Sequence, residues 1–170
     1  MSVESLFLEC SVEKLEEFTG RIEVCLGKLS DDQIWARGSG NENAIGNLVL
    51  HLTGNVRQWI LSGLGNNPDH RDRGSEFDAH GGSTAAELLA ALRDTVSEAT
   101  RIISGLNTAQ LTRMYEIQKY PVSGVEAVYH VVEHFAQHTG QIIFATKMLT
   151  GEDLGFYRHL RNPAKQKSLP

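Results

Sequence analysis

The chain has 170 residues, of which 41% are hydrophobic and 22% are charged, and its formal net charge is -5. This length suits one domain, which can bury roughly 70% of its unfolded surface without disulfides. The negative charge argues against the basic footprint that nucleic-acid binding requires. Residues 1–5 lack a basic stretch, and no apolar run approaches the ~20 residues of a membrane helix. We therefore expect a cytoplasmic protein with no nucleic-acid and no membrane partner.

Four stretches carry an apolar rhythm of helical period, whereas strand-like alternation is scarce. They cover about residues 3–29, 43–61, 84–105 and 122–150. Thr84 and Glu87 have capping-box spacing at the start of the third stretch, and Gly151 follows the fourth as a C-terminal stop. The pattern predicts an all-α four-helix bundle, up-down with a long connection between helices 2 and 3. We expect a single domain over residues 1–162 and a flexible tail over residues 163–170.

Both cysteines lie in the first stretch. Cys10 and Cys25 are separated by ~22 Å along one helix, so they cannot pair with each other within it. In a reducing cytoplasm, the expectation is two buried free thiols. The same periodicity places Leu6 in the core, and it places Leu149 on the core face of the fourth stretch.

The connections differ in kind. Residues 30–34 and 107–111 each begin with a capping residue, which is followed three positions later by Gln and then by an apolar residue. That pattern predicts a single helical turn at each corner. Residues 63–82 contain five glycines and have no period. A loop of this length is often functional, but it could equally be a flexible crossover, and both alternatives stay open.

Three histidines recur at intervals of four in the last helical stretch. They are His130, His134 and His138, and one ion cannot easily take all three because the outer two are ~12 Å apart. With Val131 at the centre of the apolar face, His138 lies ~20° away, His134 ~60° and His130 ~100°. The inward pair is therefore His134 and His138, and His130 is expected at the surface or behind the ligands.

A third metal ligand is expected from another helix, and His51, at the edge of the apolar face of the second stretch, is the best candidate. Three imidazoles leave a coordination position open for water or substrate, as in a catalytic ion site. All-nitrogen ligation suits Zn, Ni, Cu or Fe, and we expect a divalent ion, Zn or Ni. Any one of these histidines alone would more often be a satisfied core or surface residue. No HExxH pattern is present, so that class of metalloprotease is excluded.

The sequence around these histidines, in residues 50–59 and 133–142, carries a family likeness, as do residues 68–77 of the connection. In these stretches the chain resembles the DinB/YfiT-like superfamily, and within it a subgroup without an assigned activity. The resemblance implies a four-helix bundle in which one His of the second helix and an HxxxH pair of the fourth bind a divalent ion. Those positions are His51, His134 and His138 here.

Families that share this fold include metal-dependent transferases for low-molecular-weight thiols such as bacillithiol and mycothiol, and a thiol-dependent maleylpyruvate isomerase. The resemblance thus implies a thiol S-transferase or another reaction that depends on a small thiol. A metal-dependent hydrolase is the alternative, with Glu133 or Glu126 as the nearest acids. A third alternative is a non-enzymatic bundle that binds a metal or ligand, or that forms a homodimer. Trp35 and Trp59 could then mark its interface, although core positions are commoner for such residues.

Other charged and titratable residues are assigned no fixed role. Arg57, Arg71 and Arg73 could offer positive charge to an acidic thiol cofactor, or they could be solvated surface residues. His70 and His80 lie in the long connection and are left out of the site.

Overall fold

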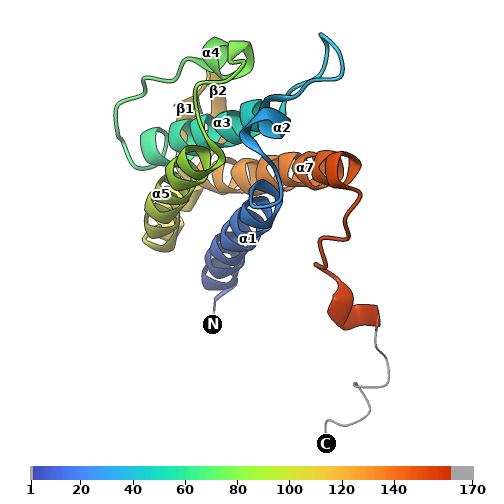
Figure 1. Ribbon diagram of the computed structural model, residues 1–170. Helices are drawn as coiled ribbons and strands as arrows, with labels where there is room; N and C mark the ends of the chain where they lie inside the picture. The colour runs from blue at the N-terminus through green and yellow to red at the C-terminus, as the bar shows by residue number, and fades with distance from the viewer. Residues whose placement is uncertain (1, 162–170) are drawn as a thin grey trace, which may run out of the picture.

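The computed structural model describes residues 2–161, which are mostly helical (Figure 1). The helical elements are α1 (Val3–Leu26), α2 (Asp31–Trp35), α3 (Ile45–Val56), the π-helix η1 (Arg57–Ser62), α4 (Arg73–Asp78), α5 (Ala85–Ser104), α6 (Thr108–Thr112), α7 (Gly124–Thr150) and the 3-10 helix η2 (Arg158–Arg161). Two short strands, β1 (Met114–Ile117) and β2 (Tyr120–Ser123), form one antiparallel pair. No helix in this described part of the chain is long and apolar enough to cross a membrane.

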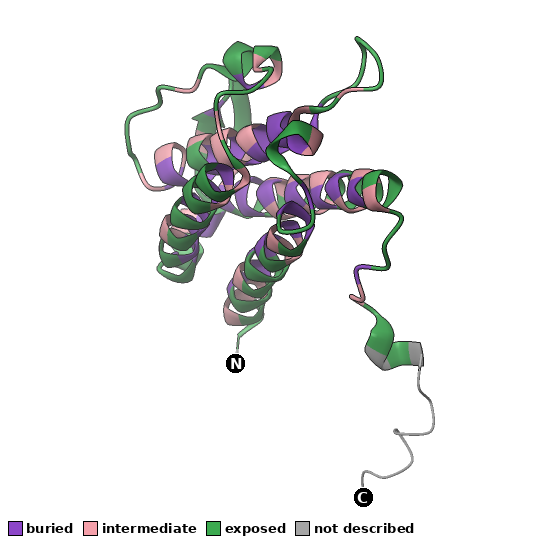
Figure 2. Cartoon of the chain, in the orientation of Figure 1, coloured by how far each residue is buried: buried purple, intermediate pink, exposed green. Residues whose placement is uncertain are grey.

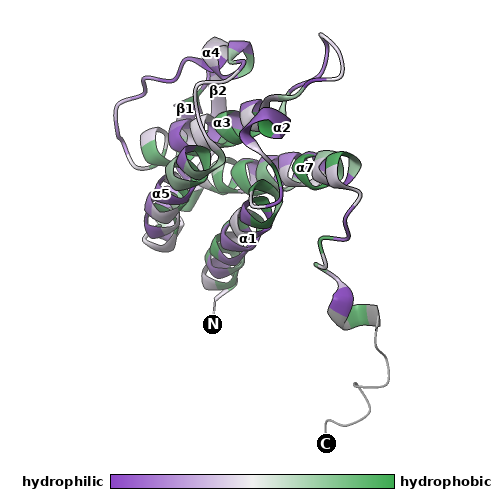
Figure 3. Cartoon of the chain, in the orientation of Figure 1, coloured by the Kyte–Doolittle hydropathy of each residue, from purple (hydrophilic) through white to green (hydrophobic). Residues whose placement is uncertain are grey.

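The long helices enclose one hydrophobic core. Helices α1 and α3 each pack against both α5 and α7, and Figure 1 shows α3 lying beside α7. The inward sides of the helices are both buried and hydrophobic (Figures 2 and 3). Side chains fully enclosed there include Leu15, Ile22, Leu52, Leu92, Phe135 and Ile142. The prediction of a mostly helical protein is confirmed.

The helix ends agree with the local sequence signals. The side chain of Thr84 caps α5 in a capping box with Glu87, and Ser123 caps α7 in the same way with Glu126. Gly151 ends α7 with φ of 70°, in the left-handed region that glycine adopts without strain. The two predicted single turns are α2 and α6, and both begin with a capping box that uses Gln. These connections are confirmed.

The second predicted helix changes its winding near its end. It begins at Ile45 and continues as an α-helix to Val56, after which η1 winds more widely. Within η1 the amide of Gly63 donates to the carbonyl of Gln58 at 3.0 Å, five residues earlier. This winding places three consecutive side chains, Trp59, Ile60 and Leu61, in the core, which no regular α-helix of one apolar face would do.

The β1–β2 hairpin was not predicted. Its turn consists of Gln118 and Lys119, with φ of 53° and 67°. Two positive φ angles are typical of the tight hairpin turn that usually carries Asn-Gly, and neither residue of this turn gives that signal. The hairpin leads directly into α7, since Gly124 follows Ser123.

Several expectations for the ends of the helices were wrong. Cys10 is exposed, so only Cys25 is a buried thiol, although both are free as predicted. Leu6 and Leu149 are 51% and 42% exposed, and each lies in the terminal turn of its helix. The tail predicted over residues 163–170 lies outside the described residues.

The long connection contains order that its composition did not indicate. Helix α4 begins at Asp72, whose side chain accepts hydrogen bonds from the amides of Gly74 and Ser75. The fully buried side chain of Asn47 on α3 donates to the carbonyls of Glu76 at 2.9 Å and Ala79 at 2.8 Å. These bonds fasten α4 onto α3, beside the first of the candidate histidines.

Candidate metal centre

Three histidines from two helices meet at one point. His51 comes from α3, whereas His134 and His138 come from successive turns of α7. The Nε2 atom of His134 lies 3.1 Å from Nε2 of His51 and 3.2 Å from Nε2 of His138. One nitrogen from each ring lies within 4.8 Å of the others. A tetrahedral ion with metal–nitrogen bonds of about 2.0–2.1 Å has nitrogen–nitrogen edges of about 3.3–3.4 Å, so the cluster could hold a metal ion.

The imidazole of His51 is held from behind. Its Nδ1 atom lies 2.9 Å from Oε2 of Glu76, and only 6% of the His51 side chain is exposed. Nη2 of Arg71 also lies 3.1 Å from this Nδ1. Because the carboxylate can only accept and lies closer, we assign the proton to Nδ1, which leaves a lone pair on Nε2. That lone pair points into the cluster. A carboxylate that holds the far nitrogen of a histidine is the usual support of a metal-ligating imidazole.

Glu76 is in turn held by Arg71. The guanidinium donates through Nε to Oε1 at 2.7 Å and through Nη2 to Oε2 at 2.8 Å. Burial would raise the pKa of Glu76, but the hydrogen bonds from Arg71 and His51 outweigh it and hold that pKa below its usual range. Glu76 is therefore a carboxylate at neutral pH, as the proton on Nδ1 of His51 requires.

The imidazole of His138 is also held through its Nδ1 atom, in this case by a neutral side chain. Its Nδ1 atom lies 2.6 Å from Oε1 of Gln141, one helical turn later. The amide oxygen accepts, so His138 donates through Nδ1 and presents an unprotonated Nε2 to the cluster. Two imidazoles thus direct lone pairs at the position next to Nε2 of His134. Converging lone pairs repel one another unless a proton or a cation lies between them.

His134 occupies the middle of the cluster and strongly resists protonation. Burial is the largest cause, and the neighbouring His138 and His51 add to it, so the pKa of His134 falls to about 3. Burial also lowers the pKa of His138. Nδ1 of His134 is buried without a hydrogen-bond partner among the described residues. The lowered pKa values favour neutral imidazoles for His134 and His138 at pH 7, which is the form that ligates metals.

His130 lies outside this group of three. Its ring lies 3.8 Å from the ring of Trp59 between centroids, at 30° to it, and its Nε2 lies 3.4 Å from Nδ2 of Asn55. The structure therefore brings together His51, His134 and His138. His130 lies one turn before His134 on α7, outside this group. Trp59 is buried in the core rather than at an open surface.

Sequence reasoning missed Glu76 and misjudged Arg71. The Arg71 side chain is only 3% exposed and is neutralised by Glu76, so it neither offers free charge nor lies in solvent. Gly54 on α3 permits this approach, because a Cβ atom there would overlap Oε1 of Glu76. The available signal was Asp72, a capping residue four positions before Glu76 in a segment otherwise without period.

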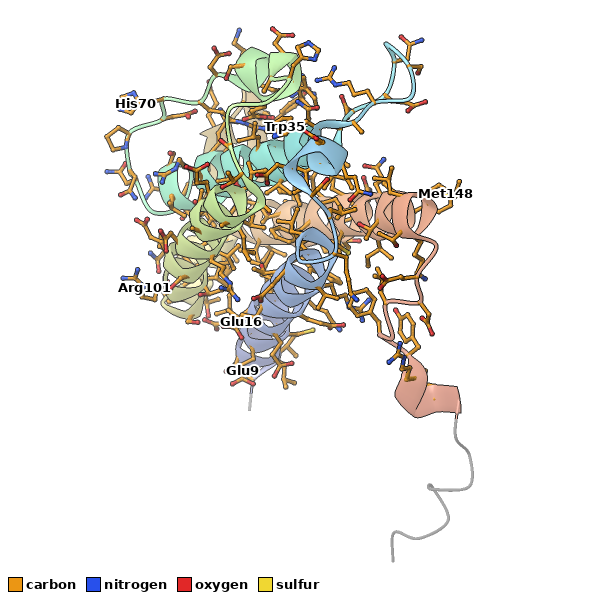
Figure 4. The ribbon with its side chains drawn as sticks, viewed as in Figure 1. Glu9, Glu16, Trp35, His70, Arg101 and Met148 are labelled. Carbon is orange, nitrogen blue, oxygen red and sulfur yellow. The ribbon has the colours of Figure 1, made fainter. Side chains whose placement is uncertain are left out.

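The remaining candidates lie away from the cluster. Arg57 and Arg73 are exposed, as are His70 and His80, and Figure 4 labels His70 on the outer part of the long connection. The two acids considered as bases are also engaged elsewhere. Glu126 belongs to the cap of α7, and Glu133 accepts a hydrogen bond from Gln137 on the exposed side of that helix.

Comparison with known proteins supports the fold. Residues 2–162 match a family described as a protein of unknown function (DUF1572). A conserved protein of Enterococcus faecalis has 15% identity and a TM-score of 0.74, over 89% of this chain and 99% of that one. A DinB-like protein of Bacillus cereus has 15% identity and a TM-score of 0.66, over 83% of this chain and 91% of that one. A DinB-like protein of Bacillus subtilis has 18% identity and a TM-score of 0.66, over 86% of this chain and 96% of that one. No functionally curated protein matches significantly.

Proposed function

Since this chain belongs to the DUF1572 family and has a DinB-like fold, we propose that it is a divalent-metal-dependent enzyme whose ion is held by His51, His134 and His138. The finer architecture, an up-down four-helix bundle with its long connection between helices 2 and 3, is part of this proposal. The observation that carries it is the convergence of three imidazoles, whose ligand atoms all lie within 4.8 Å of one another. His51 and His138 both present Nε2 lone pairs to the same point, because Glu76 and Gln141 occupy their Nδ1 atoms.

The proposed reaction is a thiol S-transfer, or another reaction that depends on a low-molecular-weight thiol. A bound Zn or Ni ion lowers the pKa of a thiol or water that it contacts, and three protein ligands leave room for one such molecule. The protein would supply three imidazole ligands, which carry no negative charge when they bind a metal; His51 is buried, and His134 and His138 are half-buried. It thereby leaves the positive charge of the ion uncompensated, which favours an anionic thiolate over a neutral thiol.

Thiol chemistry is favoured over hydrolysis because the carboxylate that contacts the cluster is already engaged by other groups. Hydrolysis needs a group that accepts a proton from the attacking water. Glu76 is the carboxylate nearest to the histidines, but Arg71 and His51 take up its oxygens. A thiol ionised at the ion needs no further base. A cytoplasmic location and a small-molecule substrate complete this proposal, with homodimer formation as an addition that sedimentation can test.

Elemental analysis of the purified full chain tests the metal site. About one equivalent of a transition metal is expected for the wild type, and none for the H134A/H138A double variant, with helical content retained. A panel of small thiols and electrophiles, assayed with and without chelator, then tests the reaction. Thiol transfer that survives removal of the metal would contradict the proposal, and stoichiometric metal without turnover would favour a binding protein.

A further inference from the structure

A groove begins one helical turn from the histidine cluster. It has a volume of about 720 Å³ and lies between the C-terminal half of α7 and residues 36–48. Leu48 lines it three residues before His51, and Gln141 lines it three residues after His138. Three helical residues span about 4.5 Å, so on both helices the residues that line the groove begin within one turn of the cluster. Gln141 belongs to both, since its amide oxygen holds Nδ1 of His138.

The walls of the groove are mostly apolar and are open to water. Phe144 and Met148 are 67% and 71% exposed, and Figure 4 labels Met148 on the C-terminal half of α7. Leu149 adds a third exposed side chain, while Ile45 and Leu48 form the buried floor. Adjacent exposed apolar side chains of this size commonly mark a binding surface, because covering them releases free energy.

Arg37 and Gln141 bring hydrogen-bond donors to the groove, beside Asn41, Asn43 and Glu42. Arg37 donates through Nη2 to Oδ1 of Asn47 and to the carbonyls of Phe77 and Ala79, at 2.8 to 2.9 Å. No ion pair joins Arg37 to a carboxylate of the described residues, and its Nε is buried without a hydrogen-bond partner. The amide nitrogen of Gln141 is also available as a donor, since only its oxygen is engaged, by Nδ1 of His138.

The one acid in the groove does not neutralise Arg37. Oε2 of Glu42 accepts from the amide of Gly38 at 2.8 Å, and Oε1 accepts from the hydroxyl of Ser39 at 3.1 Å. Glu42 thus serves the turn of residues 38–42. The groove consequently combines an apolar wall with a guanidinium that is hydrogen-bonded through Nη2 but forms no ion pair with the described residues, and this combination is complementary to an apolar molecule that carries a negative charge.

We propose that this groove binds a small monocarboxylate with an apolar body, whose carboxylate pairs with Arg37 and whose body covers Phe144 and Met148. Calling this ligand the substrate rests on the proposed function, because only that function brings it to the metal. The binding itself does not need the ion. A second copy of this chain covering the same apolar wall is the competing outcome.

Octanoate is the first probe, with 1-octanol and octylamine as matched ligands of equal chain length. Isothermal titration of the full wild-type chain should give the tightest binding for octanoate, about tenfold weaker binding for 1-octanol, and none for octylamine. Equal binding of octanoate and 1-octanol would overturn the role of Arg37. Absence of octanoate binding would overturn the groove proposal. The titration is repeated after removal of the metal. If the protein binds octanoate but has neither a stoichiometric metal nor turnover, the proposed function is contradicted and the groove proposal stands.

Two pairs of variants locate the site. Phe144→Asp should abolish octanoate binding, whereas Tyr129→Asp, at an aromatic 63% exposed on the other half of α7, should leave it unchanged. Arg37→Gln should weaken binding about tenfold, and Arg37→Lys should retain most of it, because Lys keeps the charge. Equal losses from Phe144→Asp and Tyr129→Asp would contradict the assignment. So would a dimer in sedimentation that Phe144→Asp dissociates while octanoate does not bind.

Discussion

Replacing Glu76 by Gln should separate the support of His51 from the stability of the fold. The carboxylate accepts three charge-assisted hydrogen bonds, at 2.7 and 2.8 Å from Arg71 and at 2.9 Å from His51. The amide of Gln has one oxygen for these donors and turns its own N–H groups toward the guanidinium. Both the proton on Nδ1 of His51 and the charge of Arg71 would lose their partner.

Two magnitudes follow from this geometry. Loss of the group that orients a ligating histidine typically weakens metal binding about 10- to 100-fold. Removing one partner of a buried ion pair costs about 3–5 kcal/mol, because the other charge stays buried without compensation. Since the Arg71 side chain is only 3% exposed, Glu76→Gln should lower the free energy of unfolding of the metal-free protein by about 3 kcal/mol.

The double variant Glu76→Gln/Arg71→Met separates the two effects. Removing the unpaired charge should restore most of the stability, measured by urea unfolding of the chelated protein. It should not restore metal affinity, measured by competition with a chromophoric chelator at pH 7.4. Asp72→Asn is the matched control, because it neutralises a carboxylate of the same segment that caps α4 and does not contact His51. Recovery of metal affinity together with stability, or unchanged affinity in Glu76→Gln, would refute the positioning role.

Three further predictions concern the helices that carry the cluster. His138→Ala should abolish stoichiometric metal binding in elemental analysis, whereas His130→Ala should bind a full equivalent; equal loss in both would contradict the choice of ligands. Because the pKa of His134 falls from 6.5 to about 3 on folding, the unfolded chain takes up a proton first. The metal-free protein should therefore lose stability as pH falls from about 6.5 toward 3, and urea midpoints that stay level over that range would argue against it. Gly54→Ala should lower both metal affinity and stability by displacing the carboxylate beside it, whereas Gly140→Ala, with open space around its Cβ position, should stabilise α7 by about 1 kcal/mol; thermal unfolding compares the two.

The sequence predicted those parts of the protein in which apolar residues recur with the period of an α-helix. The angular positions on the last helix separated His134 and His138 from His130, and the structure places the first two beside His51. That success has a physical basis, because α7 is one regular helix with a cap at each end and no break. Its register is therefore preserved from Val131 to His138.

The parts that were missed are too short to show a period. Helix α4 has six residues, so the single buried side chain of Glu76 resembles an ordinary surface acid in sequence. The β1–β2 hairpin has four-residue strands and a Gln118-Lys119 turn without the usual glycine. Tertiary contacts determine both elements, and one sequence read locally does not contain those contacts.

The separation of the histidines along the chain gives the cluster a role in folding as well as in chemistry. His51 and His134 are 83 residues apart along the chain and lie on different helices, α3 and α7. An ion shared between them would act as a reversible cross-link. Closing a loop of that length with a covalent bridge removes chain entropy worth about 4.5 kcal/mol from the unfolded state. Metal occupancy would thus add to the free energy of unfolding of the whole fold, and chelation would remove that contribution much as reduction does in a protein that depends on a disulfide.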